Sequence, residues 1–289
     1  MNVGERRERQ LDILSPHGFS RMHYYEWGDP ANAEVVICVH GLTRNGRDFD
    51  ALAGAIADDF RVICPDIPGR GKSDWLRNPN DYVFPVYLGA LTALIARADA
   101  TSLAWVGTSM GGLLGIALAA QQGSPISRLV INDVGPQIEP GAIERIGQYV
   151  GADPKFTSLA ELEAHVRAVS APFGPLTDAQ WRHLSETTAR ELPDGRWALR
   201  YDPGIAVPFR TAHDQSAALW ALWDAIACPT LLLRGAQSDL LSAATAQQMS
   251  MRGPKPRIVE FAGVGHAPML LDDAQIAPVA AFLRRRVGQ

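Results

Sequence analysis

The segment 107–112, which reads Gly-Thr-Ser-Met-Gly-Gly, most constrains how this 289-residue chain can fold. The apolar run 102–106 in front of it is typical of a buried strand, and the small and apolar residues 113–120 behind it are typical of a buried helix. A strand that turns into a helix over so few residues forces the central serine into a strained, exposed conformation, and flanking glycines avoid backbone clashes there. The segment therefore predicts a sharp turn that presents Ser109, rather than a glycine-rich loop with an idle serine.

Buried strands and helices alternate on both sides of this turn. Residues 11–14 and 23–27 predict an antiparallel pair of strands. Further strands are predicted at 35–39, 60–64, 126–132, 230–235 and 257–261, and helical patterns occupy 49–57, 86–98, 243–251 and 276–283. This alternation predicts a mostly parallel sheet, in which sites lie at the carboxyl ends of the strands. Side chains that follow strand ends, including His40, Asp66, Ser109 and Asp133, are expected to meet at one edge.

The alternation is interrupted after Pro136. Residues 136–212 contain helical patterns and an extended piece, but no buried strand of the core type. Capping boxes at Ser158–Glu161 and Thr177–Gln180 mark two helix starts. We therefore predict a core formed by residues 1–135 and 213–289, and a helical lid over residues 136–212 that excludes water from the site. An ordinary helical excursion on the surface is the alternative.

Two later strands are followed by an acid and a base that Ser109 needs, because a lone hydroxyl is a weak nucleophile. We expect one ring nitrogen of His266 to take the proton from Ser109 and the other to donate to Asp239. Asp133 is the alternative acid. If Asp239 is the acid, Asp133 is expected to cap or hold the first segment of the lid. The backbone N–H groups of Leu42 and Met110 are the expected oxyanion donors, and His40 is expected to brace the loop of Leu42.

Several motifs occur in order over nearly the whole chain, and through them it resembles the α/β-hydrolase family in its lidded branch of serine esterases. These motifs are His40-Gly41, residues 66–71 with Ser73, residues 107–112, Arg234-Gly235-x-x-Ser238-Asp239 and Gly263-x-Gly265-His266. The resemblance implies an eight-stranded, mostly parallel sheet with one antiparallel pair and helices on both faces. It also implies an oxyanion hole from the backbones of Leu42 and Met110.

The serine at the turn favours one group of reactions within this family. Dehalogenases and epoxide hydrolases need a carboxylate at that position. We predict hydrolysis of carboxylic esters with short-to-medium acyl or aryl groups, through an acyl-enzyme on Ser109. Carbon–carbon bond (vinylogous diketone) hydrolases, lactonases and cofactor-free perhydrolases remain open. Carbon–carbon hydrolases usually carry a further glycine-rich pattern after His-Gly, which residues 42–45 lack. A non-catalytic small-molecule binding protein on the same fold is an alternative of another class.

The neighbours of the expected catalytic residues suggest a pocket. Leu42, Met110, Leu240 and Val264 are expected to form an apolar wall, with Thr43 beside them. Arg44 either receives a carboxylate of the substrate or is a solvated surface arginine.

Composition excludes other classes of partner. The net charge is −4 and no basic stripe occurs, so nucleic acid is not an expected partner. No apolar run approaches the roughly 18 residues of a membrane span, and no signal peptide is evident. The three cysteines are widely separated and are expected to be reduced thiols of a cytoplasmic protein. No metal-ligand cluster or phosphate-binding loop is evident, so neither a metal nor another cofactor is expected. The oligomeric state stays open.

Overall fold

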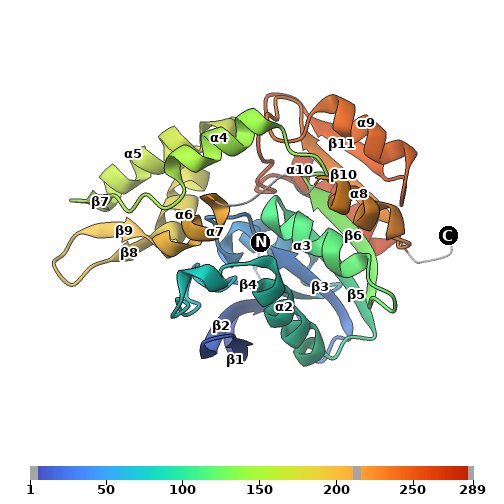
Figure 1. Ribbon diagram of the computed structural model, residues 1–289, viewed down its shortest axis with the longest axis horizontal. Coiled ribbons are helices and arrows are strands. Elements are labelled where there is room, and N and C mark those ends of the chain that lie inside the picture. Colours follow the sequence, from blue (N-terminus) through green and yellow to red (C-terminus); the bar gives the residue numbers. More distant parts are fainter. Residues whose placement is uncertain (1–5, 211–215, 286–289) are drawn as a thin grey trace.

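The computed structural model describes residues 6–210 and 216–285, and an eight-stranded sheet forms its centre (Figure 1). In spatial order the strands are β1 (Arg7–Ser15), β2 (Gly18–Trp27), β4 (Arg61–Pro65), β3 (Glu34–Val39), β5 (Ser102–Thr108), β6 (Ile126–Asn132), β10 (Thr230–Gly235) and β11 (Arg257–Phe261). Strand β2 runs antiparallel to both of its neighbours, and the other pairs are parallel. The predicted sheet and its antiparallel hairpin are confirmed.

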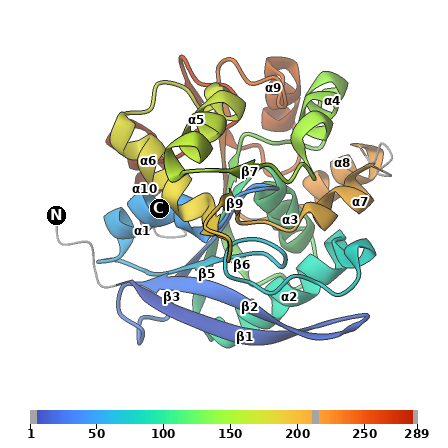
Figure 2. The ribbon, with the colours of Figure 1, turned by 90° about the vertical axis from the view of Figure 1, so that its left-hand side faces the viewer.

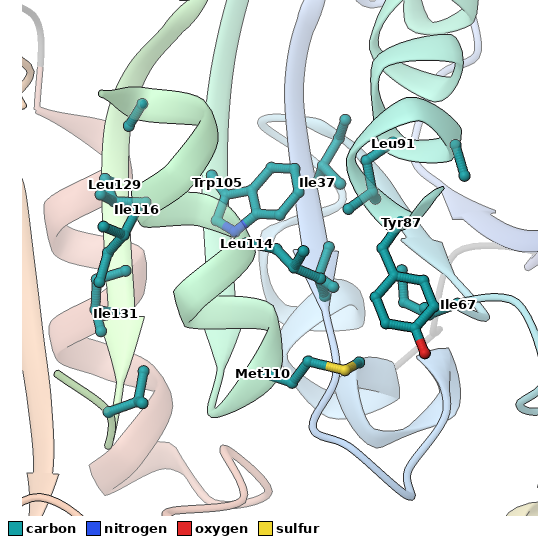
Figure 3. Close-up of a cluster of buried hydrophobic side chains, with 14 of the residues drawn as sticks. Ile37, Ile67, Tyr87, Leu91, Trp105, Met110, Leu114, Ile116, Leu129 and Ile131 are labelled. Atoms are coloured by element: carbon teal, nitrogen blue, oxygen red, sulfur yellow. The ribbon is translucent and has the colours of Figure 1, made fainter. Parts of the chain in front are cut away.

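Helices cover both faces of this sheet. One face carries α2 (Phe84–Ala98), α3 (Met110–Ala119), α8 (Ser216–Ala225) and α9 (Ala243–Met251), and the other carries α1 (Asp50–Ile56) and α10 (Asp273–Arg284). Successive strand residues point to opposite faces. Ile37 and Trp105 therefore pack with α2 and α3 (Figure 3), whereas Val36 and Val106 pack in the cluster that contains α1 and α10. Because both faces are buried, the core strands are mostly apolar on both faces instead of alternating between apolar and polar residues.

The connection between β5 and α3 has the predicted strained geometry. Ser109 has φ 52° and ψ −117°, a region that residues with a side chain rarely adopt. A Cβ on Gly107 would lie 2.2 Å from the carbonyl oxygen of Gly111, and one on Gly111 would lie 2.0 Å from that of Val39. The Trp105 indole N–H also donates to the Gly111 carbonyl at 3.0 Å. The buried core thus holds the turn that presents Ser109.

The inserted segment, residues 136–210, lies between β6 and β10 and to one side of the core sheet (Figure 1, Figure 2). It contains α4 (Pro140–Tyr149), α5 (Leu159–Val169), α6 (Asp178–Thr188) and α7 (Ala206–Arg210). It also contains a small antiparallel sheet in the order β7 (Lys155–Phe156), β9 (Trp197–Leu199), β8 (Ala189–Glu191). Some of its apolar side chains, including Leu162, Trp181 and Leu184, cluster together with Met269 of the core. Others, such as Ile146, belong to the main core cluster.

The insertion was expected to be helical with one extended piece, and β9 lies in that piece, whereas β7 and β8 were not predicted. Strands β7 and β8 have two and three residues, too few to establish a period-two pattern in the sequence. The Thr177 capping box is present as predicted. The Ser158 hydroxyl caps α5, but the Glu161 carboxylate bonds to Thr157 instead of closing the box. Residues 211 and 212 of the predicted lid lie outside the described residues.

Three further observations concern residues 6–210 and 216–285 only. No helix there is both long and apolar enough to cross a membrane. No group of three or more His, Cys, Asp or Glu side chains there is placed to hold a metal ion. The thiols of Cys38, Cys64 and Cys228 are free, and the first two are buried.

Candidate active site

Three side chains from separate strand ends form one hydrogen-bonded row. Ser109 follows β5, Asp133 follows β6, and His266 lies in the loop after β11. His266 Nε2 lies 2.9 Å from Ser109 Oγ, and His266 Nδ1 lies 2.8 Å from Asp133 Oδ2. Ser109 and His266 are therefore hydrogen-bonded as expected, and Asp133 is the third residue of the row.

The partners of Asp133 fix the tautomer of the imidazole. Asp133 is fully buried, and its carboxylate also accepts hydrogen bonds from the Gly235 N–H at 2.9 Å and the Ser238 hydroxyl at 2.7 Å. Because an ionised carboxylate only accepts, His266 Nδ1 carries the proton and donates it. Nε2 is then unprotonated and accepts the Ser109 O–H. This arrangement can remove a proton from Ser109 and stabilise the imidazolium that results.

The prediction that Asp239 contacts His266 is wrong, because His266 Nδ1 bonds to Asp133 instead. Asp239 instead forms a two-pronged ion pair with Arg145 of α4, with distances of 2.5 and 2.9 Å. Burial alone would raise the pKa of Asp239, but the hydrogen bonds and charge of Arg145 outweigh it and lower that pKa.

The loop after β10 explains this outcome. The Ser238 hydroxyl donates to Asp133 and accepts the N–H groups of Leu240 and Leu241. The loop therefore folds around Ser238, and the Asp239 side chain is left 44% exposed. Asp133 occupies the buried position beside the imidazole.

Within residues 6–210 and 216–285, neither of the two expected oxyanion donors has a protein acceptor. Met110 is the first residue of α3, so its N–H has no partner within the helix. Among the described residues no backbone or side-chain acceptor binds the N–H of Leu42 or of Met110. The carbonyl of Leu42 accepts the Nε–H of Arg70 at 2.8 Å, which fixes the orientation of that loop.

Arg70 is a positioning residue that the sequence reasoning missed. It is fully buried, and its guanidinium also donates to the Pro68 carbonyl and to the Tyr87 hydroxyl, both at 2.8 Å. Its other terminal nitrogen lies 3.9 Å from the Met110 sulfur. The only signal in the sequence is an arginine between two glycines in a tight loop, which does not reveal burial.

A cavity of about 120 Å³ opens onto Ser109 and His266. It is small beside the roughly 300–1,000 Å³ of sites for drug-sized ligands. Core loops contribute Gly41, Leu42, Thr43, Arg44, Asp48, Thr108, Ala267 and Met269, and the inserted segment contributes Arg145, Ile146, Tyr149, Ala152, Pro154, His165, Val166, Val169, Ser170, Phe173, Thr188, Leu199 and Tyr201. Much of the wall therefore comes from the inserted segment.

The pocket predictions are corrected in part. Leu42, Thr43 and Arg44 line the cavity as expected, whereas Leu240 and Val264 do not. Both of these are buried, Leu240 in the main core cluster.

Met110 does not form a wall either. Its side chain points toward Tyr87 and lies against Arg70 (Figure 3). The apolar surface comes instead from Ile146, Val166 and Val169 on α4 and α5. Nearness in sequence to a catalytic position does not indicate which segment folds over it.

Comparison with known proteins agrees with this geometry. The model of a family described as the alpha/beta hydrolase family matches residues 36–282. The chain belongs to the α/β-hydrolase family. It is 48% identical to a 3-hydroxybutyrate-oligomer hydrolase from Cupriavidus necator, over 94% of this chain and 96% of that protein. It is 30% identical to a pimeloyl-[acyl-carrier protein] methyl ester esterase from Xanthomonas campestris, over 84% and 92% of the two chains. The crystal structure of an α/β hydrolase from Novosphingobium aromaticivorans superposes with a TM-score of 0.88 at 38% identity, covering 99% of this chain and all of that one.

His40 braces the loop that carries Leu42 in this α/β hydrolase. Its Nδ1 donates to the Gly41 carbonyl at 2.7 Å, and its Nε2 accepts the Ile67 N–H at 3.0 Å. Because Nε2 is an acceptor, the ring must be neutral. Burial lowers the pKa of His40 to about 4.

This burial predicts a loss of stability in acid. Between pH 6.5 and 4 the unfolded hydrolase protonates His40 while the native state does not, so the free energy of unfolding falls as the pH falls. The expected loss from this residue is on the order of 3 kcal/mol, all of it below pH 6.5. Urea unfolding at pH 7.5 and 4.5 measures it, with His40→Gln as the comparison. An equally large pH effect in the variant would contradict this assignment.

Proposed function

We propose that this chain is a serine ester hydrolase in which Ser109 is the nucleophile, His266 the general base and Asp133 the orienting acid. The hydrogen-bonded row from Ser109 through His266 to the buried Asp133 carries the proposal. Membership of the α/β-hydrolase family and the esterases among its relatives support it.

The reaction follows from this row. Ser109 Oγ attacks the ester carbonyl carbon while its proton passes to His266 Nε2. The carbonyl oxygen becomes an oxyanion, which accepts the N–H groups of Leu42 and Met110. Collapse breaks the carbon–oxygen bond, and His266 gives its proton to the departing alcohol. A water molecule then attacks the acyl-enzyme with His266 as base, which releases the acid and restores Ser109.

Oligomers of a short hydroxy acid are the proposed substrates, with 3-hydroxybutyrate as the repeating unit. The relative from Cupriavidus necator carries that activity in its name and aligns over 94% of this chain. A cavity of about 120 Å³ suits a four-carbon unit better than a long acyl chain. We also propose that residues 136–212 act as a cap, since its helices α4 and α5 line the cavity.

A panel of substrates tests this function. The linear dimer of 3-hydroxybutyrate, its methyl ester, p-nitrophenyl butyrate and p-nitrophenyl palmitate are compared with a lactone and a vinylogous diketone. We expect hydrolysis of the first three, and kcat/KM for the butyrate at least about tenfold above that for the palmitate, because the cavity cannot enclose the longer chain. Turnover confined to the diketone or lactone would contradict ester hydrolysis. No turnover, with no labelling of Ser109 by a fluorophosphonate, would favour a binding protein.

A further inference from the structure

Two arginines of the described part of the chain line the cavity, and each forms a two-pronged ion pair with an aspartate. Arg44 contacts Asp48 at 2.6 and 2.9 Å, and Arg145 contacts Asp239 at 2.5 and 2.9 Å. The pairs differ in their surroundings. The side chains of Arg44 and Asp48 are 12% and 7% exposed, whereas those of Arg145 and Asp239 are 31% and 44% exposed.

This difference determines which guanidinium can accept a new partner. If a substrate carboxylate displaced Asp48, a buried carboxylate would lose its counter-charge in a site that water reaches poorly. If it displaced Asp239, that side chain would turn into solvent, where an exposed ion pair contributes little. Only the Arg145 pair therefore allows exchange at low cost.

A second donor lies beside Arg145. Tyr149 is one turn further along α4, so its side chain lies on the same helix face, and it also lines the cavity. Its phenol lies beside the Arg145 guanidinium, and burial raises the pKa of Tyr149, which keeps its O–H protonated as a donor. A guanidinium fork with a neutral donor beside it matches the geometry of a carboxylate.

We propose that Arg145, together with Tyr149, binds the free carboxylate of an acidic ester substrate and so determines its selectivity. Asp239 holds the guanidinium in the empty site and moves to solvent when the carboxylate binds. The inference rests on the proposed ester hydrolysis and deepens it, because a linear hydroxy-acid oligomer ends in a carboxylate. It assigns to Arg145 the role that the sequence suggested for Arg44.

The test compares one substrate with and without its charge. For Arg145→Gln we expect kcat/KM for the free-acid dimer of 3-hydroxybutyrate to fall about 10- to 100-fold, mainly through KM. For the methyl ester of the same dimer the change should stay within about threefold, because the lost interaction is with the carboxylate. Arg145→Lys should recover part of the loss, since it restores the charge without the fork. Asp239→Asn should lower KM for the free acid, because the competing carboxylate is removed.

Arg196→Gln is the matched control, because Arg196 forms an exposed pair with Asp194 away from the cavity. Equal losses on acid and methyl ester in Arg145→Gln would overturn the proposal, since they would indicate a packing role.

Binding is measured separately in a Ser109→Ala background by calorimetry, which does not depend on turnover. In this background Arg145→Gln should lower the affinity for the free-acid dimer about 10- to 100-fold and leave the affinity for the methyl ester unchanged. If the affinity for the acid falls as expected but the unmodified protein hydrolyses no ester, the proposed function is rejected and the carboxylate site is supported. Unchanged affinity for the acid would reject the site.

Discussion

Replacing Ser109 by alanine is expected to lower kcat on p-nitrophenyl butyrate by about 10⁶-fold. The Ser109 hydroxyl is the group at hydrogen-bond distance from His266 Nε2, 2.9 Å away. Other residues with hydroxyl groups also line the cavity, but among the described residues no hydrogen bond joins any of them to His266; they are Thr43, Thr108, Tyr149, Ser170, Thr188 and Tyr201. Without Ser109 the base has no alcohol to activate. Initial rates measured with a burst-phase assay check this prediction.

The control for this variant is Ser250→Ala on α9, whose exposed hydroxyl bonds only to its own helix at Gln247. Both proteins should unfold at the same denaturant concentration, because alanine keeps the Cβ that Ser109 already holds at positive φ. Near-normal turnover in the purified Ser109→Ala protein would mean that another group attacks the ester.

Asp133→Asn is expected to lower kcat by about 10⁴-fold, whereas Asp239→Asn should change it less than about tenfold. An asparagine amide at residue 133 would donate toward Nδ1, which favours the tautomer that has its proton on Nε2. That tautomer cannot accept the Ser109 proton. Asp239 does not touch His266, because it is held by Arg145. Steady-state kinetics on p-nitrophenyl butyrate compare the two variants directly.

The two substitutions are chemically identical, so each serves as the control for the other. Asp133 is also the more buried residue, so its variant needs a folding check by circular dichroism. A larger loss in Asp239→Asn than in Asp133→Asn would return the role of acid to Asp239.

The sheet and the Ser109 turn could be predicted because their signals are local. A strand buried on both faces is a continuous apolar run, as in 35–39, and the turn needs glycine wherever a Cβ would strike backbone. The pairing of Ser109 with His266 followed from the rule that strand ends share an edge.

The acid could not be chosen from the sequence for a physical reason. Asp133 and Asp239 follow the neighbouring strands β6 and β10, so strand order places both near His266. The choice depends on the Ser238 hydroxyl and the Gly235 N–H, which both point to Asp133. Such contacts belong to the folded loop and leave no periodic pattern.

The cavity wall was missed for a related reason. Its apolar residues Ile146, Val166 and Val169 are ordinary helix-face positions in α4 and α5. Only the folding of the inserted segment back over the sheet turns them toward Ser109.

Core loops and the inserted segment contribute different parts of the cavity wall, which has a consequence for engineering this protein. The proposed reacting groups lie in core loops, whereas much of the cavity wall belongs to the insertion. Libraries restricted to α4 and α5 should therefore retune which esters are accepted while leaving the hydrolytic chemistry intact. We therefore expect substitutions in different parts of this polypeptide to change ester selectivity and reactivity separately.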